Sequence, residues 1–114
     1  MDVSFTENSH GCILKLHSNI SFESIFKLET LLEKLPQSKP IALNLQEVDY
    51  ICIEFLELLK RTSRNRKISL INLQAELFVL LNLTKYDKFA HIFLNDFDFI
   101  QQKRALLNRR FAVI

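Results

Sequence analysis

Short apolar runs alternate with amphipathic stretches along most of this chain, and this alternation limits the possible fold more than any other feature. Runs of strand length begin at Ile41, Lys67 and Ala90, and a stretch with helical spacing of apolar residues follows each of the first two. Strands that alternate with helices indicate βαβ crossovers and a mostly parallel sheet. Because such crossovers are right-handed, we expect the helices to pack against the faces of that sheet.

The residues before this alternation predict a β-hairpin. Val3–Glu7 and Cys12–His17 have the length of strands, and the residues between them are typical of a turn. We expect Gly11 to adopt a positive φ in that turn. Cys12, Leu14 and Leu16 alternate with their neighbours and therefore share one face of the second strand. The hairpin would add an antiparallel edge to the sheet.

About four helices complete the prediction, and Asp96 caps or opens the last of them. The helices cover Phe22 to Leu35, Glu54 to Arg64, Gln74 to Asn82 and Asp96 to about Arg109, and the strands between them are Ile41–Leu45, Lys67–Leu73 and Ala90–Leu94. Their spacing predicts that the following residues face inward: Phe22, Ile25, Leu28, Leu32 and Leu35, then Phe55, Leu56 and Leu59, then Leu77, Leu80 and Leu81. We therefore expect residues 1–114 to form a single α/β domain with a mostly parallel mixed sheet of about four to five strands.

Composition excludes several classes of protein. The two cysteines, Cys12 and Cys52, make no disulfide framework, and no signal peptide is visible, so we expect a reduced, cytoplasmic protein. No stretch approaches the roughly 20 apolar residues of a membrane span. With Gly11 as its single glycine, the chain has no glycine-rich phosphate cradle. A net charge of +2 is too small to indicate direct DNA binding.

Three stretches of the sequence carry a resemblance to a known family. Ile41–Ile51 is similar to the family's strand pattern L-D-L-S-x-V-x-F-I, Ile68–Leu73 to its next strand, and Leu77–Phe89 to the pattern that follows. In this order and spacing they resemble the STAS domain, the fold of bacterial anti-sigma factor antagonists. The resemblance implies a non-enzymatic protein-binding module whose partner is a kinase-type anti-sigma factor, which is a serine kinase, or a phosphatase.

The chain departs from the family at its regulatory loop. The family's D-S-S-G positions fall on Cys52, Ile53, Glu54 and Phe55. In the family, a serine here is phosphorylated, and the modification switches partner choice. Ile53 and Glu54 replace the hydroxyl residues, so no phosphorylation is expected at the usual position. The resemblance implies that partners bind through Tyr50, Cys52, Ile53, Glu54 and Phe55.

Each of the three replaced residues Glu54, Phe55 and Ile53 can be interpreted in two ways. Glu54 is either a built-in negative charge where a phosphate would sit, or a helix-start glutamate that the helix dipole favours. Phe55 is expected to turn into the interface between sheet and helix, with an exposed apolar contact as the alternative. Ile53 fits a buried or an exposed position equally well.

The sequence gives little support for catalysis, metal binding or cofactor binding. Cys52 near a helix start has the position of an activated thiol, but nothing brings His10, His17 or His91 to it, so we expect a buried structural cysteine. No metal-ligand spacing and no cofactor motif occur, and no enzyme is predicted.

Two basic clusters and two turn positions add further expectations. The clusters, Lys60–Lys67 and Lys103–Arg110, are expected to be solvated faces, with an acidic partner, lipid headgroups or nucleic acid as alternatives. Asn65 is predicted as a left-handed helix cap, and Lys85 replaces a glycine of the family.

Two functions remain open at this point. The first is regulation of a kinase-type anti-sigma factor or a similar partner without phosphorylation at the usual site. The alternative is a small cytoplasmic STAS subunit of an envelope phospholipid-transport ABC system, in which the domain braces an ATPase.

Overall fold

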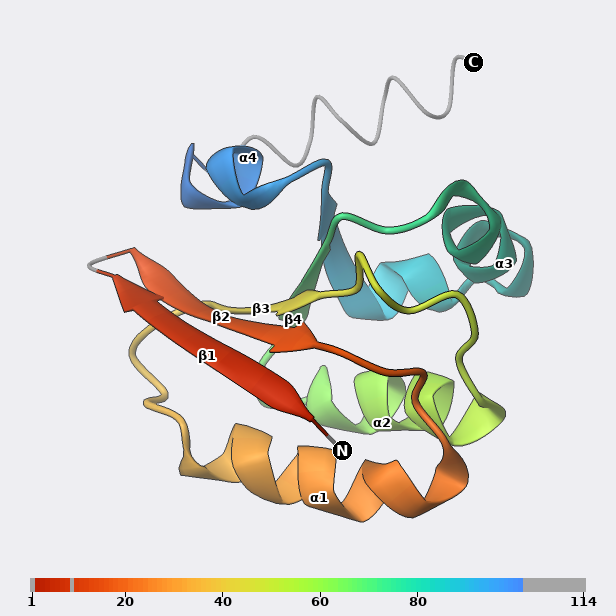
Figure 1. The fold of residues 1–114 in the computed structure, drawn as a ribbon, viewed down its shortest axis with the longest axis horizontal. Coiled ribbons are helices and arrows are strands. Elements are labelled where there is room, and N and C mark those ends of the chain that lie inside the picture. Colours follow the sequence, from red (N-terminus) through yellow and green to blue (C-terminus); the bar gives the residue numbers. More distant parts are fainter. Residues whose placement is uncertain (1, 9, 102–114) are drawn as a thin grey trace.

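One mixed sheet of five strands, in the order β1-β2-β3-β4-β5, forms the centre of the structure (Figure 1). The computed structural model describes residues 2–8 and 10–101. β1 and β2 are antiparallel, and every other neighbouring pair is parallel, which confirms the predicted α/β class and its antiparallel edge. The strands are β1 (Val3–Asn8), β2 (Gly11–Leu16), β3 (Ile41–Asn44), β4 (Ile68–Ile71) and β5 (Ala90–Phe93).

Helices cover both faces of this sheet. They are α1 (Phe22–Lys34), α2 (Ile53–Thr62), α3 (Ala75–Thr84), the 3₁₀ helix η1 (Tyr86–Phe89) and α4 (Asp96–Gln101). In Figure 1, α1 and α2 run along one face, and α4 lies on the opposite side. The prediction missed η1, and the predicted continuation of the last helix to about Arg109 lies outside the described residues. The Lys103–Arg110 cluster also lies there.

The two faces of the sheet bury different sets of side chains. Cys12, Leu14 and Leu16 lie in the larger core with α1, α2 and α3, as predicted. Ile13 points to the other face and packs with Phe93 and Phe99 under α4. All residues of β3 and β4 are buried, which is typical of parallel strands covered on both faces.

Two of the residues predicted to face inward are exposed. The side chain of Phe22 is 69% exposed, because it stands at the first position of α1, and Leu28 and Leu32 supply the buried residues of that helix. Leu80 is exposed although Leu77 and Leu81 are buried. α3 is apolar on nearly every side, so its periodicity alone does not indicate which residues face the sheet.

Gly11 has a different role from the predicted one. Gly11 does not have a positive φ, and Asn8 instead closes the turn, its Oδ1 accepting from the backbone N–H groups of His10 and Gly11. A Cβ at Gly11 would lie 2.8 Å from the carbonyl oxygen of Pro40 and 3.0 Å from the ring of Phe99. Glycine is therefore required because the start of β2 packs closely against α4 and against the residue that precedes β3.

The residues with a left-handed backbone conformation also differ in part from those predicted. Lys85, which replaces a glycine of the family, caps α3 with φ 65°. Asn65 does not adopt a positive φ, so its predicted role is wrong, whereas Asn72 at the end of β4 does, with φ 57°. The backbone N–H groups of Asn65 and Arg66 both donate to the Thr62 carbonyl, so the chain leaves α2 through a right-handed turn.

Candidate functional site

The loop from β3 to α2, residues 45–52, lies at the edge of the sheet where the parallel strands end. Ligand sites in α/β sheets gather at this edge. The backbone of the loop is anchored at its start, since Leu45 N–H donates to Ile71 O (3.0 Å) and Gln46 N–H to the Asn44 side chain (3.0 Å). Val48 is buried beneath it. The loop is therefore built as a fixed surface.

A contact from a distant part of the chain holds the second half of the loop. The side-chain oxygen of Asn19 accepts from the backbone N–H groups of Asp49 (2.9 Å) and Tyr50 (3.3 Å). Ile20 and Ile51 form an isolated parallel bridge beside it. Asn19 was not among the predicted site residues, because a contact across 30 positions leaves no local signal.

Two large side chains project from the end of this loop and from the first residue of α2. Tyr50 is 60% exposed and Ile53 is 57% exposed, whereas Ile51, Cys52 and Phe55 are buried. The predicted burial of Phe55 is confirmed, and the open question about Ile53 is settled in favour of exposure. The start of α2 and the residues before it therefore present two large exposed side chains to solvent.

The loop ends at the first turn of α2. Cys52 is the N-cap residue, and its side chain makes no capping hydrogen bond. Glu54 is half-buried in the first turn, where the unpaired N–H groups and the helix dipole favour a negative charge. This position fits both readings of Glu54, the helix-start glutamate and the built-in negative charge.

The structure gives neither cysteine the surroundings of a nucleophile. Cys52 is buried, as expected of a structural cysteine. Burial, together with the neighbouring carboxylate of Glu7, raises the pKa of the Cys12 thiol. His17 is engaged elsewhere, by hydrogen bonds to Ser4 Oγ (2.6 Å) and to the carboxylate of Glu47 (3.2 Å).

Glu47 gives the loop a charged contact with the end of β2. Its carboxylate lies 3.1 Å from Lys15 Nζ and 3.2 Å from His17 Nδ1. The hydrogen bond from Lys15 lowers the pKa of Glu47. A depressed carboxyl pKa stabilises the fold above the ordinary pKa of the group, and this contribution is lost as the pH falls through the folded-state pKa.

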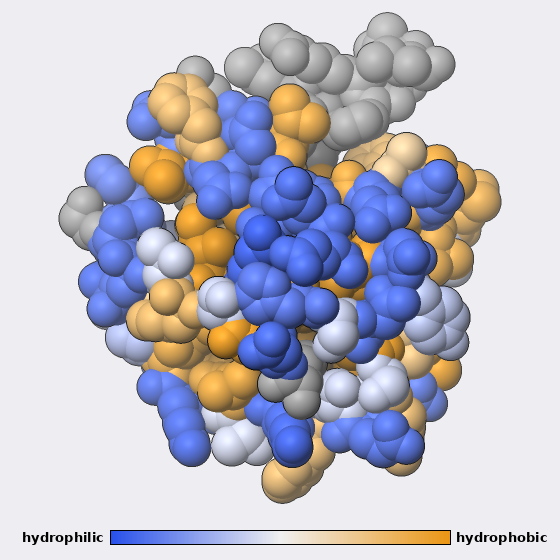
Figure 2. All heavy atoms as spheres, in the orientation of Figure 1, coloured by the Kyte–Doolittle hydropathy of each residue, from blue (hydrophilic) through white to orange (hydrophobic). Residues whose placement is uncertain are grey.

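Figure 2 shows hydrophilic side chains over the middle of one face of the molecule.

An apolar groove begins beside the same loop. The amide nitrogen of Gln74 donates to the Gln46 carbonyl (3.4 Å), which places the start of α3 against the loop. From there the groove, about 370 Å³ in volume, runs between α3 and β5. Its apolar lining includes Leu73, Phe78, Val79, Ile92, Phe93 and Leu94. The groove therefore adds an apolar surface close to the loop.

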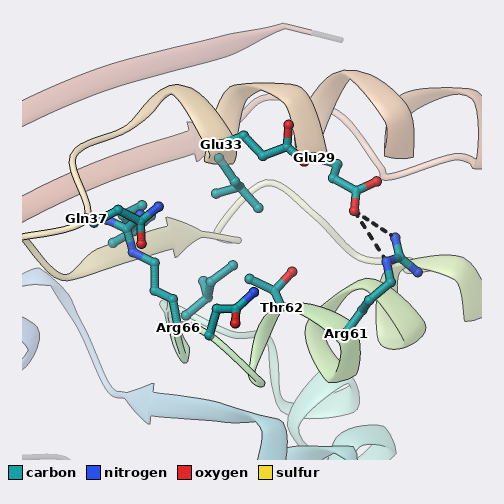
Figure 3. A pocket seen from close by; sticks show the side chains of 10 residues that line it. Glu29, Glu33, Gln37, Arg61, Thr62 and Arg66 are labelled. Atoms are coloured by element: carbon teal, nitrogen blue, oxygen red, sulfur yellow. Dashed lines mark hydrogen bonds and ion pairs between the residues drawn. The ribbon is translucent and has the colours of Figure 1, made fainter.

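A second, smaller pocket of about 180 Å³ lies at the opposite edge, between the C-terminal ends of α1 and α2 (Figure 3). Glu29 reaches from α1 to pair with Arg61 on α2, at 3.1 Å, on one side of the pocket. Arg66 lies on the other side, beside Gln37. Arg61 and Arg66 of the Lys60–Lys67 cluster thus contact other parts of the fold, whereas Lys60, Arg64 and Lys67 are exposed, as expected of a solvated face.

Arg66 closes the connection between α1 and β3. Its Nη2 donates to the backbone carbonyls of Pro36 and Lys39, while Nη1 is buried and has no hydrogen-bond partner among the described residues. Burial lowers the pKa of this guanidinium below its usual range. The guanidinium group of Arg66 thus stabilises the loop between α1 and β3, which contains Pro36 and Pro40.

We expect Arg66→Met to lower the free energy of unfolding by about 1–3 kcal/mol, because the two carbonyls lose their donor while the side-chain stem is kept. Denaturant unfolding followed by circular dichroism measures the change. The matched control is Arg64→Met at an exposed position of the same cluster, with an expected change within about 0.5 kcal/mol. Equal stabilities of the two variants would contradict the role of Arg66.

Within residues 2–8 and 10–101, no three histidine, cysteine or acidic side chains lie close enough together to hold a metal ion. No helix in these ranges combines the length and the apolar composition needed to cross a bilayer.

Comparison with known proteins identifies the fold. No family model matches the sequence, and no curated protein matches it. A solved structure of an anti-sigma-factor antagonist (STAS) domain protein from Planctomyces limnophilus matches with a TM-score of 0.71 at 13% identity. The match covers 88% of this chain and 95% of that one. The chain therefore has the fold of a STAS domain, which confirms the fold that the sequence resemblance implied.

Proposed function

We propose that this chain is a non-enzymatic, cytoplasmic protein-binding module that acts as an anti-sigma factor antagonist does. Its partner would be a kinase-type anti-sigma factor or the corresponding phosphatase. The observation that carries the proposal is the β3–α2 loop, because Asn19 and Val48 fix its backbone while Tyr50 and Ile53 remain exposed. This loop and the first turn of α2 occupy the position through which the family resemblance implies partner binding.

Regulation of this module would differ from that of its phosphorylated relatives. Ile53 has no hydroxyl group, and Glu54 already brings a negative charge to the first turn of α2. Neither residue accepts a phosphate from a serine kinase. Binding would then be controlled by the abundance of the two proteins or by the state of the partner, and the partner's kinase activity would leave the loop unchanged.

Affinity purification of the tagged chain from its native host, followed by mass spectrometry, tests this proposal. We expect an anti-sigma kinase or a phosphatase to co-purify, with no phosphate on residues 52–55. Recovery of an ABC ATPase with its permease would overturn the proposal in favour of envelope phospholipid transport. Phosphate on Thr62 or Ser63 would keep the partner but overturn regulation without phosphorylation.

A further inference from the structure

The open edge of β1 is a second exposed surface, separate from the β3–α2 loop. Among the described residues, β1 pairs with β2 alone, and most of the residues of β1 are exposed. Natural edge strands are usually protected by proline, lysine, a bulge or a covering segment. Residues 3–8 contain no proline or lysine, and their pairing with β2 is unbroken. By contrast, the opposite edge strand, β5, contacts η1 and α4.

The hydrogen bonds of the hairpin show which backbone groups of β1 face outward. His17 N–H donates to the Asp2 carbonyl at 3.0 Å, in register with the pairing of Val3 with Leu16. Hydrogen-bonded and non-hydrogen-bonded pairs alternate along an antiparallel ladder. The N–H and C=O groups of Val3, Phe5 and Glu7 therefore point away from β2. These groups are available to a further strand.

We infer that β1 pairs in antiparallel orientation with β1 of a second copy of this chain, with Phe5 of one copy opposite Phe5 of the other. This register pairs all three outward-facing residues, because Val3 of each copy then lies opposite Glu7 of the other. A shift in either direction leaves one of these residues unpaired. The joined sheets would run continuously through both copies.

The side chains of β1 fit this register. Phe5 is 51% exposed and lies opposite Leu14 on the sheet face that packs against α1. Its pairing with itself brings two aromatic rings together across the strands, which is a favourable cross-strand contact. On the other face, Ser4 and Thr6 lie opposite each other and can share a hydrogen bond. The two Glu7 carboxylates are kept apart, since each faces Val3.

Sedimentation equilibrium over a series of concentrations tests the inference. We expect the wild-type chain to reach twice its mass of 13.4 kDa, and Phe5→Lys to remain monomeric because two ammonium groups would meet at the centre. Leu83→Lys is the control, because Leu83 is an exposed apolar residue on α3. A wild-type monomer at all concentrations would overturn the inference, as would a Phe5→Lys dimer.

A cross-linking experiment tests the register itself. Opposite residues of a hydrogen-bonded pair have Cα atoms about 5.5 Å apart, which is within the range of a disulfide. Under mild oxidation, we expect Phe5→Cys to form a covalent dimer many times faster than Leu83→Cys. Equal rates would contradict the register. Neither experiment involves the β3–α2 loop, so failure of this inference leaves the proposed function untouched.

Discussion

Replacement of Phe55 by alanine is expected to lower the free energy of unfolding by about 3–5 kcal/mol. Phe55 lies in the first turn of α2, and its side chain is completely buried in the larger core. Alanine would remove most of this side chain and leave a cavity that the sheet and the surrounding helices fill only in part. The family has a glycine at this position, so the aromatic ring is a feature of this chain's own packing.

Denaturant unfolding of Phe55→Ala and of Phe26→Ala measures this effect. Phe26 is the matched control, because it is also a helical phenylalanine but lies largely exposed on α1. We expect its replacement to change stability by no more than about 0.5 kcal/mol. A loss below about 1 kcal/mol for Phe55→Ala would show that the ring is not part of a tightly packed core.

Ile53→Asp is expected to weaken partner binding at least about tenfold, which corresponds to ~1.4 kcal/mol. Ile53 projects from the start of α2, and a contact surface that buries it would have to desolvate the new carboxylate. The fold should tolerate the change, because an acidic residue in the first turn of a helix is favourable. A loss of binding would therefore result from the changed contact surface and not from unfolding of the variant.

Titration of the co-purified partner with the wild-type chain and the variant, by calorimetry, gives this ratio. Leu83→Asp is the control, since it places the same charge at an exposed apolar position of α3. We expect this control to bind as the wild type does. Equal affinities of Ile53→Asp and the wild type would place the contact surface elsewhere on the molecule.

Periodicity was sufficient to predict most of the fold. The alternation of apolar strands and amphipathic helices gave the parallel sheet, the hairpin edge and the burial of Leu28, Leu56 and Leu77. It failed at the first position of a helix, as at Phe22, and where a helix is apolar on nearly all sides, as at Leu80. In both cases, burial depends on what the neighbouring elements cover, which a local pattern does not contain.

The structural surroundings of the β3–α2 loop were predicted only in part. The sequence placed Tyr50 and Phe55 around the start of α2 and favoured burial for Phe55. It did not indicate Asn19 or Glu47, because their partners come from other strands and loops of the fold. Arg66 was grouped with solvated charges, although it ties down the α1–β3 connection. Such contacts depend on the crossover geometry that brings distant segments together.

Hydrogen–deuterium exchange of the captured complex locates the partner-binding surface without any substitution. We expect binding to slow exchange of the backbone amides in residues 46–56, which span the β3–α2 loop and the first turn of α2. Slower exchange confined to β1, to α1 or to the pocket between α1 and α2, with residues 46–56 unchanged, would contradict the proposal that the partner binds through this loop.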